Sequence, residues 1–433
     1  MFLDEDYLYM QQADASTTST TDDNIDNGTL TVQVSNASGQ FPIANASIEI
    51  ADTGNPDRIL EVINTDANGF TEPVALPAPP LEYSMTPTDH QPYSEYNIRI
   101  RAVNYEEEII SGVQIFSGED GNQQIQLKVK LTDADTYNPI AIGPHTLWGL
   151  YPPKIAEEEI KPVNASGEIV LSRVVIPEYI VVHDGAPTDN TATNYYVQYK
   201  DYIKNVASCE IYSTWPQATI EANVLAIMSF TLNRVYTEWY RNKGYDFTIT
   251  SSTAFDHKWM QNKTTYDSIS NVVDRIFDQY LSRPNVTQPI LTQYCDGKRV
   301  ICPNWMSQWG SKYLGDQNYT AIEILRNYYG SSIYINETDT ISGIPSSYPG
   351  YDLTIGSSGE KVRQLQEQLN RIAQNYPAIP TVAADGVYGS QTENAVRTFQ
   401  KIFKLPQTGI VDFPTWYKIS DIYVAVSRIA ELM

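Results

Sequence analysis

Basic residues, cysteines and long apolar runs are scarce in this chain of 433 residues, and each shortage excludes a class of protein. The 29 lysines and arginines stand against 52 aspartates and glutamates, whereas a nucleic-acid-binding protein needs a basic surface. No apolar run approaches the ~18 residues that a membrane-spanning helix requires. Three cysteines are too few for a disulfide framework. Cys295 and Cys302 are close enough to bridge across a turn, and their spacing leaves bridged and free thiols both open.

The N-terminal end lacks the features of a secretory signal. MFLDEDYLYMQQ is acidic and has neither a basic flank nor an apolar core. We therefore expect either a mature form or a chain that is made and used without conventional secretion. Residues 1–150 hold 23 of the 52 acidic residues but only 5 of the 29 basic ones, so the N-terminal third is strongly acidic. Residues 1–27 are polar and low in complexity, which predicts a disordered tail.

The length and the hydrophobic content of 42% are enough for about three domains with apolar cores. From Thr29 onward apolar and polar residues alternate, with turn signals such as Asn68-Gly69, which predicts an antiparallel β-sandwich over residues 28–132. Residues 133–176 mix proline, glycine and charge, and we predict a linker with a strand near Glu168–Val175. Residues 336–354 are rich in serine, proline and glycine and predict a second linker.

The stretch from Asp201 to Arg234 predicts a short helix, a turn and a long helix. Pro216 suits the first turn of the second helix, and the apolar residues after it recur at helical spacing. Glu210 falls near the end of the short helix, between apolar neighbours. The negative end of the helix dipole and an apolar setting both disfavour an ionised carboxylate. Glu210 is therefore a candidate general acid, and the alternative is a solvated glutamate at a helix end.

Tyr-Ile-Lys-Asn-Val-Ala, then Glu210, then Trp215-Pro216 and a long helix resembles the core of the stage II sporulation protein D family. The resemblance implies that residues 177–335 form an α+β lytic transglycosylase domain that cleaves peptidoglycan, with Glu210 as its catalytic acid. Met306–Gly310 resembles the second signature of the family, a loop beside that glutamate. The side chains that the resemblance assigns to substrate binding are Ser307, Gln308, Trp309, Ser252 and Thr253.

The resemblance fails at the zinc ligands of the family, which are a histidine and two cysteines. Alignment on Gly244-Tyr245-Asp246 puts Thr250 and Phe255 where the cysteines would be, and neither can replace a thiolate. A substitute site built from Cys295, Cys302 and His257 is the alternative that we weigh against this. We predict no metal and no other cofactor. Glu221 and Met228 also stand where the family has basic residues, which puts basic contacts to the substrate in doubt.

Residues 355–433 contain two amphipathic helical stretches around Asp385-Gly386-x-Tyr388-Gly389, followed by TG-x-VD at 408–412. This pattern resembles the three-helix peptidoglycan-binding domain. The candidates for ligand contact in it are Asp385, Tyr388 and Gln400.

The order of these parts resembles the spore cortex-lytic enzymes, which begin with a precursor β-domain. The N-terminal β-region itself resembles the carboxypeptidase-regulatory, transthyretin-like domain. The resemblance implies an enzyme of the spore cortex and coat region that degrades cortex peptidoglycan during germination. It also implies an activating protease that removes the N-terminal region. Glu210 would protonate the glycosidic oxygen and then deprotonate the muramoyl C6 hydroxyl, which closes a 1,6-anhydro ring.

Two alternatives remain open from the sequence. The first is a hydrolytic muramidase that uses water, with Glu221 or Asp256 as the base, since ordinary glycosidases need a pair of carboxylates. The second is a catalytically inactive cell-wall-binding protein, suggested by the missing zinc ligands.

Overall fold

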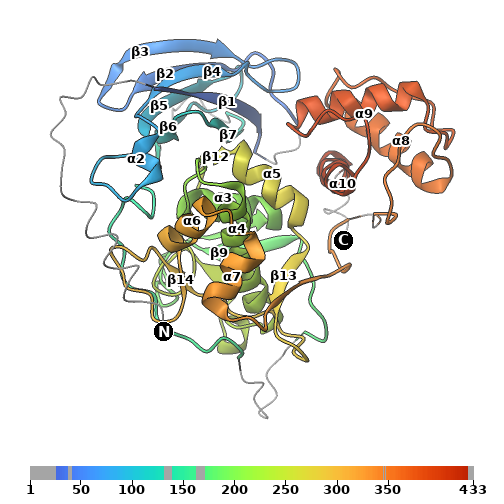
Figure 1. Ribbon diagram of the computed structural model, residues 1–433. Helices are drawn as coiled ribbons and strands as arrows, with labels where there is room; N and C mark the ends of the chain where they lie inside the picture. Colours follow the sequence, from blue (N-terminus) through green and yellow to red (C-terminus); the bar gives the residue numbers. More distant parts are fainter. Residues whose placement is uncertain are drawn as a thin grey trace.

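The computed structural model in Figure 1 describes residues 26–37, 41–130, 139–161, 171–344, 346 and 348–427. These residues form a β-rich N-terminal domain, a mixed α and β central domain and a helical C-terminal module. This agrees with the predicted multidomain architecture at that coarse level. Residues 1–25 of the predicted disordered tail lie outside the described residues. Its last two residues, 26 and 27, belong to strand β1, which begins at Asp26.

The N-terminal domain consists of two sheets around one apolar core, to which Leu30, Val32, Ile48 and Ile98 contribute buried side chains. One sheet has the order β12-β7-β1-β4 and the other β3-β2-β5-β6-β8. The strands are β1 (Asp26–Asn36), β2 (Ser47–Asp52), β3 (Asn55–Asn64), β4 (Val74–Ala78), β5 (Ser94–Arg101), β6 (Glu108–Ile115), β7 (Asp120–Leu127) and β8 (Ile140–Ala141), with the short helix α2 (Glu82–Met85) between β4 and β5.

The prediction that all these strands are antiparallel was wrong. β1 runs parallel to β7, and β6 runs parallel to β8. Alternation of apolar and polar residues reports which face of a strand is buried, and it is the same for both directions of pairing. The first sheet also crosses the domain boundary, because β12 (Thr265–Tyr266) of the central domain pairs with β7.

The central domain is built around α4 (Gln217–Tyr236), whose residues are buried over most of its length. Helices α3 (Tyr199–Glu210), α5 (Asp267–Ile276), α6 (Gln308–Asp316) and α7 (Ala321–Tyr329) pack around it. The remaining elements are β9 (Tyr179–His183), β10 (Asn194–Gln198), η1 (Arg241–Lys243), β11 (Ile249–Thr250), β13 (Gln279–Ser282), β14 (Tyr294–Cys295), β15 (Met306–Ser307) and β16 (Tyr334–Glu337).

The segment predicted as the first linker does not hang free between domains. Its residues 144–161, here called the strap, pack on the central domain, where His145 and Lys161 are buried and Lys154 is half-buried. For the predicted strand at 168–175, residues 168–170 lie outside the described part, and residues 171–175 contain no strand. A run rich in proline and charge lacks the period of a regular element, so its packing could not be seen in the sequence.

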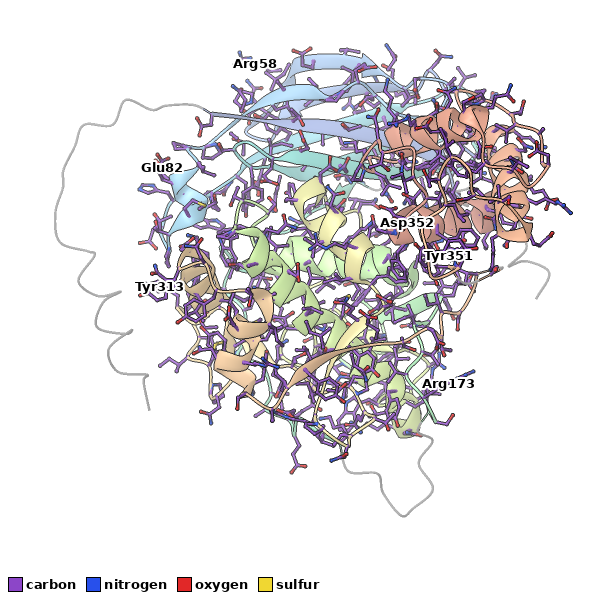
Figure 2. The ribbon with its side chains drawn as sticks, turned by 45° about the vertical axis from the view of Figure 1, so that its right-hand side comes forward. Arg58, Glu82, Arg173, Tyr313, Tyr351 and Asp352 are labelled. Carbon is purple, nitrogen blue, oxygen red and sulfur yellow. A yellow bond between two sulfur atoms is a disulfide. The ribbon has the colours of Figure 1, made fainter. Side chains whose placement is uncertain are left out.

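The C-terminal module contains α8 (Glu360–Ala373), α9 (Ser390–Ile402) and α10 (Phe413–Ser427). Its α10 packs on α5 of the central domain, where Phe277 contacts Phe413 and Tyr417. Figure 2 shows the module beside the β-domain, with Tyr351 and Asp352 on the segment that leads into it. Within the described ranges, no helix is both long and apolar enough to cross a membrane.

Candidate active site

Glu210 is the last residue of α3, and its side chain is buried, with 3% of the residue exposed. The backbone N–H of Lys258 donates to one carboxylate oxygen at 2.7 Å, and the Gln308 side-chain amide donates to the other at 3.1 Å. Burial raises the pKa of Glu210, and the positive charge of Lys154 and these two donors oppose the rise without cancelling it. A buried carboxyl group with a raised pKa can carry a proton near neutrality, as a general acid must.

A pocket of about 140 Å³ opens at this carboxyl group and is lined by Thr253, Tyr294, Asp296 and Gln308 as well as Glu210. A second hollow of about 400 Å³ shares Asp296 and Arg299 with it. Tyr212, Trp309 and the loop 86–90 of the N-terminal domain line this second hollow. The two hollows therefore adjoin beside the 295–302 loop, and the N-terminal domain covers one side of the second hollow.

The strap forms another wall of the Glu210 pocket through residues 149–154. The ammonium group of Lys154 lies 4.6 Å from the ring centre of Tyr294 and 5.1 Å from that of Phe230, and it donates to the carbonyl of Asp256. Burial lowers the pKa of Lys154, while the charge of Glu210 acts in the opposite direction. Arg299 fastens the same segment by donating to the carbonyls of Leu147 and Gly149. The strap is thus held against one side of the Glu210 pocket.

A buried ion-pair cluster anchors the strap further along. Arg234 of α4 lies between Asp256, at 2.8 Å, and Glu157 of the strap, at 2.6 Å. Burial alone would raise the pKa of Glu157, but Arg234 and Lys161 outweigh it and hold that pKa at about 2. Tyr240 also donates to Asp256. We refer to Arg234, Glu157, Asp256 and Lys161 as the clasp.

The clasp occupies the region in which the family resemblance would place zinc. Thr250 stands at one of the family's cysteine positions. Its hydroxyl and its backbone N–H both donate hydrogen bonds to the Asp256 carboxylate. Among the described residues, no three histidine, cysteine or acidic side chains lie together as a metal site requires. Cys295 and Cys302 form a disulfide, so they offer no thiolates to a metal.

The structure brings together only some of the residues that the sequence assigned to the site. Glu210, Gln308 and Thr253 line one pocket. Gln308 is 1% exposed and donates to the Glu210 carboxylate, which gives it a positioning role, and its predicted contact with substrate stays a prediction. Ser252 is not among the residues that line this pocket.

The predicted loop at 306–310 is a junction between β15 and α6. Ser307 is the N-cap of α6 and accepts a hydrogen bond from the Gly310 N–H, so its hydroxyl is engaged within the fold. Trp309 is 5% exposed and packs against Trp215 and Tyr212, beside the second hollow. A direct sugar contact by either side chain stays a prediction.

In the C-terminal module, the Tyr388 and Gln400 side chains are engaged within the fold, and their predicted ligand contacts stay a prediction. The Tyr388 hydroxyl is buried and donates to the Gly409 carbonyl at 2.8 Å. Gln400 is 0% exposed and binds the Gly409 N–H and the Ile410 carbonyl. The signature residues tie α9 to the loop at 406–412. Asp385 is exposed and closes its turn by accepting from the Val387 N–H, so its ligand role remains a prediction.

Sequence reasoning missed Asp296, a second carboxylate in the Glu210 pocket. Its side chain accepts from the N–H groups of Arg299 and Val300, which shapes the loop closed by the disulfide. At Gly297 a Cβ would lie 1.9 Å from the Ser307 hydroxyl, and φ is +75°, so a glycine is required there. The Asp-Gly pair between two cysteines was the signal available in the sequence.

Neither base named for the hydrolytic alternative lies in the pocket. Asp256 belongs to the clasp, and Glu221 pairs with Arg275 at 2.5 Å.

Comparisons with known proteins bear mainly on the C-terminal module. Residues 358–419 match the family described as "Putative peptidoglycan binding domain". Among solved structures, the crystal structure of the SleB N-terminal domain is 32% identical, covering 18% of this chain and 97% of that one with a TM-score of 0.16. GBS52, the minor pilin of Streptococcus agalactiae, is 14% identical over 25% of this chain and 48% of that one, with a TM-score of 0.18. No curated protein matches.

Proposed function

We propose that this protein is a lytic transglycosylase of spore cortex peptidoglycan, made as a precursor, with Glu210 as its single acid–base residue. The observation that carries the proposal is the setting of Glu210. It is one buried carboxyl group with a raised pKa, held by neutral donors, at the end of a pocket. The match of residues 358–419 to a peptidoglycan binding domain supports peptidoglycan as the polymer that the enzyme acts on.

The contacts of Glu210 fit both halves of the reaction. The protonated carboxyl group gives its proton to the glycosidic oxygen as the bond from muramoyl C1 to that oxygen breaks. The resulting carboxylate takes the proton of the C6 hydroxyl, whose oxygen forms the new bond to C1. The Lys258 N–H and the Gln308 amide donate to the carboxylate and stabilise it between these steps. The nucleophile belongs to the substrate, so this chemistry needs no second carboxylate.

A second candidate function is hydrolysis of the same bond, and the observation that favours it is Asp296 in the Glu210 pocket. Two carboxyl groups in one site can act as acid and base on a water molecule. Muropeptides released from cortex separate the two functions. Anhydro ends that persist in an Asp296→Asn variant support the transglycosylase, and reducing ends that disappear with that variant support the hydrolase. A chain that releases neither product even after a protease has separated the N-terminal region is an inactive wall-binding protein.

We further propose that the N-terminal region restrains the enzyme until a protease separates it from the central domain. The strap lies against the Glu210 pocket, and loop 86–90 covers the adjoining hollow. The acidity of residues 1–150 adds repulsion from the carboxylates of peptidoglycan, which salt screens over about 8 Å at physiological ionic strength. Release of the strap would open both hollows to a glycan strand. The spore cortex and coat region is the proposed location.

A further inference from the structure

A groove of about 500 Å³ lies where the three domains meet, and it shares no lining residue with the Glu210 pocket. One wall comes from β1 and β7 of the N-terminal domain. The second comes from β10 and the segment 259–263 of the central domain. The third comes from the C-terminal module, through Tyr376 and Phe403.

The β-domain wall presents amide side chains. Gln33 stands beside Gln124 in the parallel register of β1 and β7, and Ser35 stands beside Gln126. The side chains of Gln33, Gln124 and Gln126 make no hydrogen bond to any part of the chain that the structure describes. Each amide offers two donors and an acceptor. This row of neutral polar groups is therefore available to a ligand in the groove.

The other two walls combine aromatic rings with charged side chains, namely Asp201, Lys204 and Lys263 on the central domain and Lys418 and Asp421 on the module. Tyr196 of β10 is 73% exposed, and the Tyr195 ring lies 5.2 Å from that of Trp259. The Trp259 indole N–H is buried, with no hydrogen-bond partner among the described residues. In the module, the rings of Tyr376 and Phe403 are 5.0 Å apart. Aromatic faces next to a few convergent polar groups are typical of ligand sites.

Contacts between the domains hold the three walls together. The ammonium group of Lys404 in the module donates to the Thr31 hydroxyl of the β-domain at 3.0 Å and lies 3.9 Å from Asp267 of the central domain. Phe403 also meets Phe70 of the β-domain edge to face, with ring centres 6.4 Å apart. The groove is thus a composite site, which exists only while the N-terminal domain is docked.

We propose that this groove binds a strand of N-acetylated amino sugars. Amide side chains match the acetamido and hydroxyl groups of such sugars, and aromatic rings cover the apolar faces of sugar rings. The unengaged amides are neutral, and the charged side chains of the lining are of both signs, so the groove does not favour a ligand of one charge. One wall also belongs to the stretch that matches a peptidoglycan binding domain. The site would hold the precursor on the polymer before activation, and it does not depend on Glu210 being catalytic.

Binding of hexa-N-acetylchitohexaose to the full-length chain, measured by calorimetry, tests the proposal. The chain carries Glu210→Gln, so that no ligand is consumed. One variant adds Tyr196→Ala and another adds Gln33→Ala with Gln124→Ala. We expect either change to raise the Kd about tenfold, as removal of a central contact does. Tyr319→Ala and Gln317→Ala are the controls, because both residues are exposed and outside the groove, and they should change the Kd less than about twofold.

Three results would overturn the proposal. The first is no binding of the sugar at millimolar concentration. The second is binding that the groove variants leave unchanged, which would place the sugar elsewhere. The third is a synthetic stem peptide that binds in place of the sugar and loses affinity in the groove variants. Turnover by the Glu210→Gln chain would instead refute the proposed catalytic role, and it would leave the binding result as it stands.

Discussion

Glu210 and Glu157 are both largely removed from solvent, Glu210 more completely, yet their pKa values are shifted in opposite directions. Glu210 receives hydrogen bonds from a backbone N–H and an amide, both neutral, and its pKa is raised. Glu157 faces the guanidinium of Arg234 and the ammonium of Lys161, and its pKa is about 2. Burial disfavours the charged form; the ion pairs of Glu157 outweigh this effect, whereas the donors and the Lys154 charge near Glu210 do not. The first glutamate is suited to carry a proton, and the second is suited to hold the strap.

Glu210→Gln tests the first half of this comparison and should have the largest effect. The amide keeps the shape of the side chain but cannot give and retrieve a proton. We expect cleavage of cortex peptidoglycan to fall by ~10²–10⁴-fold or more. A raised pKa means that the ionised form costs stability at neutral pH, so the variant should melt at or above the wild-type temperature. Near-wild-type turnover, measured as released muropeptides, would remove Glu210 from the mechanism.

Arg234→Met tests the second half, because it leaves Asp256 buried without its cation and Glu157 with Lys161 alone. Breaking a buried ion pair on one side costs about 3–5 kcal/mol in the free energy of unfolding. Urea unfolding at pH 7 measures this loss. Arg275→Met, which breaks a pair at a site where the arginine side chain is 47% exposed, is the control and should cost less than about 1 kcal/mol. Equal losses in the free energy of unfolding would show that the clasp contributes no more to stability than an exposed ion pair.

Lowering the pH should weaken the clasp, because it protonates Glu157. Its pKa in the folded chain, about 2, is below the ordinary value of 4.5, so its contribution to stability is complete above 4.5 and is lost as the pH falls toward 2. That contribution is about 3 kcal/mol on the basis of the shift. In Glu157→Gln, the free energy of unfolding should be lower at pH 7 and should fall less between pH 5 and pH 3. The same acid dependence in variant and wild type would contradict the assignment.

The strap variant Tyr151→Ala with Lys154→Ala should activate the full-length chain. It removes one wall of the Glu210 pocket and leaves the clasp in place. We expect the cleavage rate to rise about tenfold, the effect of making a binding-competent state more populated by ~1.4 kcal/mol. Ile155→Ala changes a neighbouring strap residue that is 48% exposed and does not line the pocket, and it serves as the control. An unchanged rate would mean that loop 86–90 or charge is the main restraint.

Gln308→Leu should have the smallest effect on activity, and it tests whether the Gln308 amide helps to set the pKa of Glu210. The Gln308 amide lowers that pKa by donating to the carboxylate, so its loss should raise the pKa further. Activity that needs protonated Glu210 falls as the pH rises through this pKa. The alkaline limb of the profile of kcat/KM against pH should therefore move to higher pH in the variant. A shift to lower pH would show that Gln308 does not act through the carboxylate.

The sequence alone determined the parts of this protein that depend on neighbouring residues. The helix that ends at Glu210, the proline that opens the next helix and the two helices around the Asp-Gly turn all follow from local spacing and capping. Burial of alternating strand residues was visible as well. The candidate role of Glu210 could also be predicted from the sequence, because its apolar neighbours and its place at a helix end are encoded within a few residues.

Only the tertiary structure decided what approaches Glu210 from far along the chain. Strand direction, the packing of the strap, the Arg234 clasp and the place of Asp296 in the pocket join residues that are tens of positions apart. The same holds for Tyr388 and Gln400, whose polar groups bind backbone atoms of a loop. Alternation and helical period report which face of an element is buried. They carry no information about the partner that buries it, which depends on how all the elements pack together.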